Sequence, residues 1–246
     1  MLAIISSPPL FGHFQRVPGW QKTDSAKPFR WAVEDGKYIM EEYRETIIRK
    51  YRHIARLPDF LFGFTFPLRR KAIERLHLQP GSSVLEIGCS SGANFALLHE
   101  AVGETGEIVG VDLSPDMIAQ AKLRIEKTGW KNIAVIEKAA EEVVLERQFD
   151  GLLLFAMHDV LTAPKALDNV LKYLKSGGYI VTAGPMLPSK YPGKLLRPLI
   201  KVIFSRFAVS KEYMDTPWRM LAERVKELRV TGNGPGIFYI ADGKRE

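Results

Sequence analysis

The stretch 84–95 constrains the fold more than any other part of the chain. It begins with a short apolar run, residues 84–87, which is typical of a buried strand. Gly88 and Gly92 follow, and glycine adopts backbone angles that other residues avoid and lets a ligand approach the main chain. Apolar residues then recur at helical spacing up to Gly103, a natural stop. A strand, a tight turn and a helix in this order present free backbone N–H groups to a ligand.

Two common motifs fit this turn poorly. The dinucleotide-binding fingerprint G-x-G-x-x-G needs a glycine where Ser90 stands, and its closing glycine comes one residue early. The nucleophile elbow G-x-S-x-G matches residues 88–92 literally, but its catalytic triad needs a histidine late in the chain. The last histidine is His158, and an elbow normally follows several strands, whereas 84–87 is the first core strand that we expect.

Two acidic residues accompany the turn and favour a third interpretation. Glu86 lies two residues before Gly88, and Asp112 ends the next strand-like segment, twenty residues past Gly92. An acid at this spacing accepts hydrogen bonds from ribose hydroxyls in doubly wound nucleotide-binding sheets. Together, the glycine turn, Glu86 and Asp112 resemble motif I and the following acid of class I S-adenosylmethionine (SAM) methyltransferases.

The resemblance implies that the chain binds SAM as cofactor and methyl donor. Glu86 would orient the methionine end, the glycine turn would leave room for it, and Asp112 would hold the ribose. The family usually has an acid beside the adenine where this chain has Ala139, so backbone groups or Glu141 would take over that contact. We expect no metal ligands. The implied cofactor-binding residues are Glu86, Gly88, Ser90, Gly92, Asn94, Asp112, Leu113, Met117, Ala139, Ala140, Glu141 and Phe155.

Strands and helices alternate through the rest of the core, which predicts an α/β fold with a doubly wound, mostly parallel sheet. The resemblance implies seven strands and a closing antiparallel hairpin. Such sheets bind ligands beyond the carboxyl ends of their strands, where Glu86, Asp112, Ala139 and His158 all fall. We expect strands at 107–112, 132–136, 149–155, 179–183, 229–231 and 236–241, and helices at 36–56, 69–78, 115–128, 164–175 and 218–228.

The sequence predicts two regions: an N-terminal arm with cap helices, 1–80, and a SAM-binding core, 81–246, that carries a lid at 185–215. The segment 51–60 partly matches the Tyr-Asp-x-x-Ala-x-x-Tyr-Asp segment of quinone and small-molecule methyltransferases, which forms part of the cap over the cofactor. Tyr51 is therefore a candidate pocket residue, and plain packing is its alternative role.

Charge is distributed unevenly. Of the net charge of +7, residues 1–80 carry +6, residues 81–189 carry −5 and residues 190–246 carry +6. Six basic residues and no acid lie in 190–211, where apolar residues recur at helical spacing. A basic amphipathic helix of this kind indicates peripheral contact with a membrane surface or an anionic partner. The alternative is an ordinary surface helix that covers the sheet.

Candidate catalytic residues follow the fourth predicted strand. His158 is the best candidate for a general base, because the pKa of an unperturbed imidazole lies near neutrality. Its alternative role is a hydrogen bond to Asp159 or to the backbone. The candidate catalytic residues are therefore His158, Asp159 and Tyr51. The Asn/Asp-Pro-Pro-Tyr sequence of amino-methylating nucleic-acid enzymes is absent after this strand. We therefore expect no nucleic-acid partner, despite the positive charge.

The sequence thus predicts SAM-dependent methyl transfer to a lipophilic or anionic small molecule, such as a quinone precursor, a phospholipid headgroup or an isoprenoid. Two alternatives stay open: a SAM-fold enzyme with non-methylating or cyclising activity, and a non-catalytic membrane- or RNA-binding protein. The single Cys89 excludes a disulfide framework. Neither a signal peptide nor a bilayer-spanning stretch is visible, so we expect a cytoplasmic protein that can lie at the membrane surface. The sequence does not indicate an oligomeric state.

Overall fold

The computed structural model describes residues 45, 48–49, 63–188, 193–207, 214–233 and 236–246. All of them lie in the compact unit Glu41–Glu246. The predicted arm, most of the predicted helix 36–56 and the candidate residue Tyr51 lie outside the described residues. Residues 45 and 48–49 are helical.

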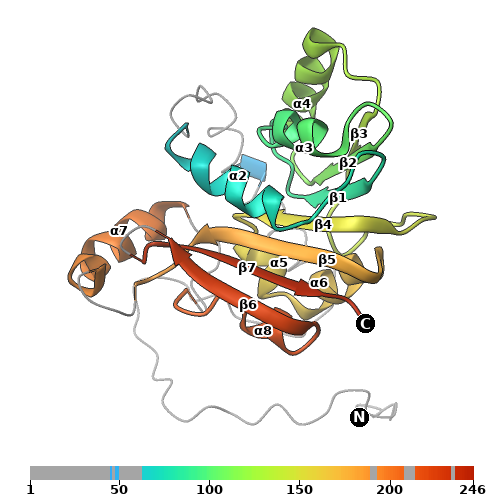
Figure 1. Ribbon diagram of the computed structural model, residues 1–246. Helices are drawn as coiled ribbons and strands as arrows, with labels where there is room; N and C mark the ends of the chain where they lie inside the picture. Colours follow the sequence, from blue (N-terminus) through green and yellow to red (C-terminus); the bar gives the residue numbers. More distant parts are fainter. Residues whose placement is uncertain (1–44, 46–47, 50–62, 189–192, 208–213, 234–235) are drawn as a thin grey trace, which may run out of the picture. The chain divides into compact units, whose positions relative to one another are not determined.

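The described residues form one seven-stranded sheet with the order β3-β2-β1-β4-β5-β7-β6 (Figure 1). The first five strands run parallel, and β7 pairs antiparallel with both β5 and β6. This confirms the predicted doubly wound sheet with its closing hairpin. The strands are β1 Ser83–Ile87, β2 Glu107–Asp112, β3 Ile133–Glu137, β4 Phe149–Phe155, β5 Leu174–Pro185, β6 Lys226–Asn233 and β7 Phe238–Lys244.

Helices cover both faces of the sheet. Successive strand residues point to opposite faces, so Val84 joins one buried cluster and its neighbour Leu85 joins the other. The first cluster packs under α2, α3 and α4, and the second packs under α5, α6 and α8. The helices are α2 Phe66–Glu74, α3 Phe95–Val102, α4 Pro115–Thr128, α5 His158–Leu161, α6 Pro164–Leu171, α7 Arg197–Phe207 and α8 Arg219–Ala222, with a 3-10 turn, η2, at Gly193–Leu196.

The ends of α4 follow from local sequence, as predicted. The Ser114 hydroxyl accepts a hydrogen bond from the Met117 backbone N–H, and Pro115 takes the first helical position. Gly129, at φ 75°, ends α4 in the left-handed conformation that favours glycine.

Three predicted helices have wrong boundaries. The helix 164–175 ends at Leu171, because Leu174 already pairs with Phe149 in the sheet. The last helix, predicted over 218–228, is the single turn α8, since β6 begins at Lys226 and pairs with β7. The helix predicted over 69–78 begins and ends earlier, as α2.

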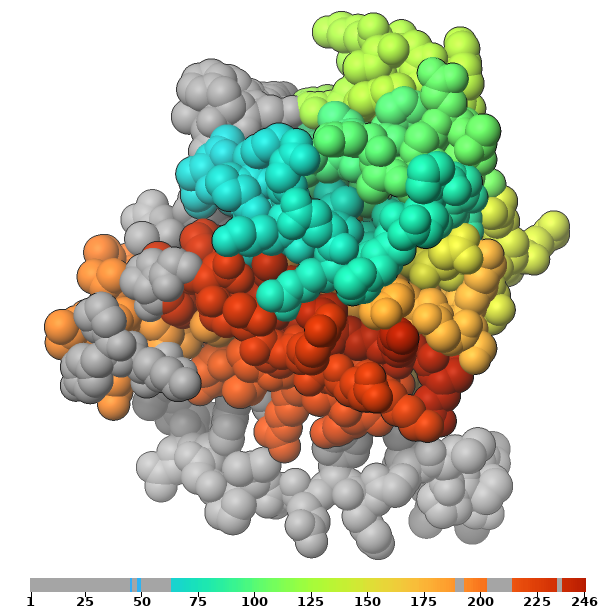
Figure 2. Space-filling view, in the orientation of Figure 1, coloured from blue at the N-terminus to red at the C-terminus, as the bar shows by residue number. Residues whose placement is uncertain are grey.

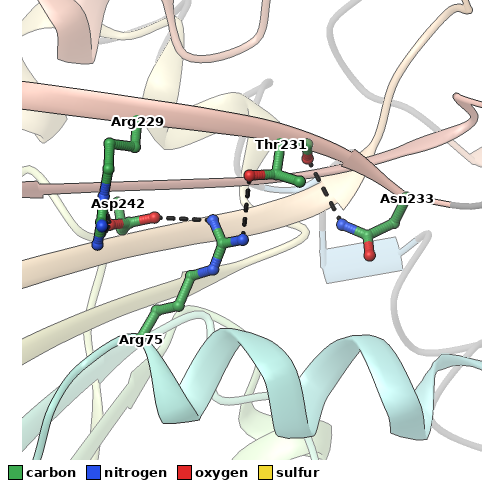
Figure 3. A network of polar contacts seen from close by, with 5 residues as sticks. All are labelled: Arg75, Arg229, Thr231, Asn233 and Asp242. Carbon is green, nitrogen blue, oxygen red and sulfur yellow. Dashed lines mark hydrogen bonds and ion pairs between the residues drawn. The ribbon is translucent and has the colours of Figure 1, made fainter.

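The C-terminal end of helix α2 is hydrogen-bonded to strands β6 and β7. Arg75 follows α2 and donates hydrogen bonds to Asp242 Oδ1 at 2.8 Å and to Thr231 Oγ1 at 3.0 Å (Figure 3). Arg229 Nη2 donates to the other carboxylate oxygen of Asp242 at 2.6 Å. In Figure 2 the cyan surface of α2 adjoins the red surface of the C-terminal hairpin. The helix before the core is thus tied to the last strands of the chain.

Within the predicted lid, 185–215, residues 193–207 are helical, as η2 and α7. Ile200 of α7 is buried in a small cluster with Leu187 and Met214. The expected apolar stripe is only partly buried, since Leu196 and Leu199 are 42% and 60% exposed. Among the described helices, none is long and apolar enough to cross a membrane.

Candidate active site

The glycine turn after β1 is held against the end of β2. The backbone N–H groups of Gly88 and Cys89 both donate to the Val111 carbonyl, at 2.7 and 3.1 Å. Gly88, Ser90 and Gly92 all have positive φ, at 72°, 53° and 76°. Ser90 differs from the two glycines because its side chain makes a positive φ sterically unfavourable. Such a conformation persists only where the surrounding structure fixes it.

Asp112 helps to hold the Ser90 backbone in this conformation. Its Oδ2 accepts a hydrogen bond from the Ser90 N–H at 2.8 Å, and its Oδ1 accepts one from the Ser114 N–H at 2.9 Å. Burial raises the pKa of Asp112, and these backbone hydrogen bonds act in the opposite direction. The carboxylate therefore lies against the turn at the tip of β2, where the sequence analysis expects the ribose ligand.

Glu86 is a buried acid with an unfilled hydrogen-bonding position. It is 1% exposed, and its Oε1 accepts a hydrogen bond from Asn94 Nδ2 at 2.5 Å. Its Oε2 is buried and has no hydrogen-bond partner among the described residues. Burial raises its pKa to about 8, against the influence of Asn94 and Arg69. A buried polar atom without a partner is costly, so this atom fits a site that a polar ligand completes.

Arg69 of α2 is a site residue that sequence reasoning missed. Its Nη1 donates to Asn94 Oδ1 at 2.8 Å, its Nε donates to Thr65 Oγ1 at 2.9 Å, and its guanidinium lies 4.3 Å from the centroid of the Phe155 ring. The contact joins residues 25 positions apart, and nothing in the local pattern of α2 singles out this arginine from its neighbours. Only the fold reveals it.

Asn94 connects Arg69 and Glu86. It occupies the N-cap position of α3, yet its side chain makes no capping hydrogen bond to that helix. Asparagine favours this position because its side chain usually caps. Here both ends of the amide are used elsewhere, since Oδ1 accepts from Arg69 and Nδ2 donates to Glu86. The predicted ligand Asn94 thus lies beside Glu86 as an organising residue.

Two glycines of the turn also serve internal packing. A Cβ on Gly88 would lie 1.9 Å from Met157 Sδ, and one on Gly92 would lie 2.5 Å from the Phe95 ring. Part of the room predicted for a cofactor is therefore occupied by these side chains in the structure. Met157 is the second residue that the sequence analysis missed, and it covers the turn from the loop after β4.

The adenine side of the predicted site lies after β2 and β3. Ser90 Oγ is 3.1 Å from Met117 Sδ, which places Met117 beside the turn. Ala139 and Ala140 are buried, whereas Leu113 and Glu141 are half-buried. The Ala139 carbonyl accepts two backbone hydrogen bonds, from Glu142 and Val143, at 3.0 Å each. These residues gather at the carboxyl ends of the strands, as expected.

His158 and Asp159 begin α5, just past the carboxyl end of β4, and both are half-buried. Ala156, which precedes them, has a φ of 58° and redirects the chain after the strand. The structure thus places both predicted catalytic residues at the sheet edge that carries Glu86 and Asp112. Among the described residues, no group of three or more His, Cys, Asp or Glu side chains could hold a metal ion.

A second hollow lies on the other side of the sheet from Glu86 and Asp112, at the amino ends of the strands. A shallow cavity of about 280 Å³ lies at the amino ends of the strands, with Ser82, Asp150 and Tyr179 in its lining. Lys175, also in its lining, donates to Asp150 at 2.6 Å. Because these charges already satisfy one another, the edge with the unfilled Glu86 oxygen is the better candidate for the active site.

Comparison with known proteins gives a family match and named relatives. A family profile described as "Methyltransferase domain" matches residues 78–215, more than half of the chain. The chain is 32% identical over 182 residues to a demethylmenaquinone methyltransferase of Staphylococcus aureus, an alignment that covers 69% of this chain and 74% of that protein. It is 26% identical over 115 residues to the enzyme of the same name from Symbiobacterium thermophilum, covering 46% of each chain.

Solved structures share the fold. N-methyltransferase NodS from Bradyrhizobium japonicum, in complex with S-adenosyl-L-homocysteine, superposes with a TM-score of 0.51 at 19% identity. The superposition covers 73% of this chain and 86% of that one. At this identity the likeness concerns the fold alone.

Proposed function

Because the chain belongs to the family of SAM-dependent methyltransferases, we propose that it methylates a lipophilic small molecule of the quinone-precursor type. The named relatives support this substrate class, since two of them are demethylmenaquinone methyltransferases. The alignment spans less than half of the Symbiobacterium thermophilum protein, 46% of its length, so the acceptor needs a direct test.

The observation that carries the proposal is the pairing of Glu86 and Asp112 around one glycine turn. When bound, SAM supplies an electrophilic methyl group on a sulfonium, so the protein has to align the acceptor and exclude water. Asp112 would hold the ribose hydroxyls through the lone pairs that Ser90 and Ser114 leave open. Glu86 offers its unpartnered oxygen to the methionine end.

A general base matters only for an acceptor that has to lose a proton. A hydroxyl-bearing ring of the quinone-precursor type is such an acceptor, and we propose His158 for this role. Its place past the carboxyl end of β4 and its half-buried state support the assignment. Asp159, the next residue, is the candidate to orient the imidazole.

The same proposal includes contact with a membrane surface through η2 and α7. Leu195, Leu199 and Val202 are 71%, 60% and 62% exposed. Lys194, Arg197 and Lys201 lie on the same segment, and each cation near an anionic membrane contributes about 1 kcal/mol. A lipophilic acceptor resides in the bilayer, so an enzyme that reaches it gains from such a surface.

The test is methyl transfer from methyl-labelled SAM to a demethylated naphthoquinol, with phosphoethanolamine and a short-chain isoprenoid acceptor in parallel. Label in the quinol supports the proposal, and label in another acceptor replaces the substrate class. Consumption of SAM without transfer of label indicates a non-methylating enzyme. Absence of a binding signal with millimolar SAM in calorimetry overturns the proposal. A His158→Gln variant should bind SAM normally and lose about a hundredfold or more in rate.

A further inference from the structure

We propose that Arg69 binds the α-carboxylate of the methionine end of SAM and thereby selects adenosyl ligands that carry an intact amino-acid end. The inference deepens the proposed function and rests on it. It assigns a ligand role to a residue outside the glycine motif, on a helix that precedes the core.

The position of Arg69 is the first argument. Helix α2 carries it to the carboxyl edge of the sheet, where its guanidinium lies 4.3 Å from the centroid of the Phe155 ring. Phe155 ends β4, the neighbour of β1, and Glu86 lies on β1. The cation therefore lies beside the strand tips that the glycine turn borders, next to the predicted methionine end of the site.

The donors of Arg69 are the second argument. Nε and Nη1 are used by Thr65 and Asn94, whereas Nη2 has no hydrogen-bond partner among the described residues. Burial lowers the pKa of Arg69, because water is largely withdrawn from the cation. A partly buried guanidinium with donors to spare suits a carboxylate, which it binds in a planar, often bidentate geometry.

The order of acceptor and donor groups is the third argument. The methionine end of SAM is a zwitterion with one ammonium and one carboxylate. The site presents an acid, Glu86, and a cation, Arg69, which the Asn94 amide separates while it bonds to both. This order matches the ligand, with the Glu86 oxygen that lacks a partner as acceptor for the ammonium and the guanidinium as donor to the carboxylate.

A purely structural role explains the other arginines near α2 better than it explains Arg69. Arg70 lies 3.5 Å from Glu100 of α3 in an exposed ion pair, and Arg75 bonds to Asp242 and Thr231. Those two side chains find their partners in other elements of the fold. Arg69 bonds to a neutral amide and a hydroxyl, and the acid nearby, Glu86, is not its direct partner.

The test compares two ligands and four forms of the protein by isothermal titration calorimetry. The ligands are S-adenosylhomocysteine and its decarboxylated analogue S-adenosyl-3-thiopropylamine, which keeps the ammonium. The proteins are the wild type, Arg69→Met, Arg69→Lys and the matched control Arg70→Met. Arg69→Met should weaken S-adenosylhomocysteine about tenfold to a hundredfold and leave the decarboxylated analogue within about twofold. Arg69→Lys should restore part of the loss, and Arg70→Met should change neither ligand.

The outcomes separate this inference from the proposed function. If neither ligand binds the wild type, the proposed function and this inference both fail. If both ligands bind and Arg69→Met weakens them equally, or weakens neither, only this inference fails. Should Arg69→Met not fold, the wild type alone decides: it must prefer S-adenosylhomocysteine by about tenfold or more, and equal affinities contradict a carboxylate ligand.

Discussion

Glu86 and Asn94 share a 2.5 Å hydrogen bond inside a site from which both side chains are almost entirely hidden, at 1% and 2% exposure. The bond leaves the second oxygen of Glu86 without a partner among the described residues. Two neighbouring elements, the end of β1 and the start of α3, thereby create a polar position that the protein itself does not fill.

Glu86 should make stability depend on pH. Burial raises its pKa to about 8 from an ordinary 4.5, so the native state holds a proton that the unfolded chain releases at lower pH. Stability from the neutral acid is therefore full below about pH 4.5 and is lost as pH rises through about 8. We expect the melting temperature of the wild type to fall between pH 5.5 and about 8.5 more steeply than that of Glu86→Gln, measured by calorimetry.

Other groups also titrate in this range, so the comparison needs a second variant. Glu126 is an exposed acid of α4, and Glu126→Gln should follow the wild-type pH profile. Parallel profiles for the wild type and Glu86→Gln would show that Glu86 is ionised throughout, contrary to the prediction.

Asp112→Asn should weaken both the turn and the cofactor site. An amide group offers one acceptor oxygen where the carboxylate offers two, and Ser90 and Ser114 donate to different oxygens. One backbone N–H would then face an NH₂ group, at a cost of about 1–3 kcal/mol in unfolding free energy. S-adenosylhomocysteine should bind about tenfold more weakly or worse. Urea unfolding and calorimetry measure the two effects.

The control for this change is Asp168→Asn, on α6, where the carboxylate forms an ion pair with Arg224. That variant should keep the wild-type affinity for the ligand. If Asp112→Asn binds S-adenosylhomocysteine with unchanged affinity, Asp112 does not bind the ribose.

Gly88→Ala should destabilise the protein through a clash with Met157. Its Cβ would lie 1.9 Å from Met157 Sδ, and the φ of 72° is itself unfavourable for alanine. Gly129 has a similar φ of 75° in the left-handed region with nothing near its Cβ position, so Gly129→Ala isolates the backbone strain. We expect a loss of about 1 kcal/mol for Gly129→Ala and about 2–4 kcal/mol for Gly88→Ala in urea unfolding.

A double variant identifies the clashing side chain. The clash is absent from Gly88→Ala/Met157→Ala. The double variant should therefore lose less free energy of unfolding than the sum of the losses in the two single variants. Strict additivity would mean that Met157 is not what Gly88 accommodates.

The sequence predicted the sheet and missed the most informative contact at the site. The alternation of strands and helices, the caps of α4 and the placement of Asp112 follow from local patterns, because periodicity, capping residues and turn glycines act over a few positions. Arg69 joins Asn94 across 25 positions, and no local pattern encodes such a contact. The short α8 was mistaken for a long helix because its apolar spacing continues into β6, where pairing with β7 decides the outcome.

Asp242 should be a stability residue, distinct from the active site. Its side chain is 2% exposed and accepts hydrogen bonds from Arg75 on one oxygen and from Arg229 on the other. Asp242→Asn should cost about 2 kcal/mol or more, because two cations lose their counter-ion. Arg75→Met should destabilise more than Arg229→Met, since the Arg75 side chain is 29% exposed and that of Arg229 is 67% exposed.

An exposed ion pair of the same hairpin provides the comparison. Lys226 and Glu246 lie 2.5 Å apart with side chains 67% and 64% exposed, so Lys226→Met should change stability little. Denaturant unfolding ranks the four variants. If Lys226→Met lowers the free energy of unfolding as much as Asp242→Asn does, the buried network contributes no more to stability than an exposed ion pair.

The exposed face of η2 and α7 should bind anionic vesicles. Leu199→Ser/Val202→Ser removes two side chains that are 60% and 62% exposed, so it should weaken co-sedimentation with phosphatidylglycerol vesicles without loss of stability. Leu123 of α4 is 54% exposed, and Leu123→Ser should bind like the wild type. Lys201→Glu should weaken binding most at low salt, because the ionic contribution is screened as salt rises. If the Leu199→Ser/Val202→Ser and Leu123→Ser variants sediment alike with the vesicles, α7 is an ordinary surface helix, and the acceptor must reach the site without a membrane-bound enzyme.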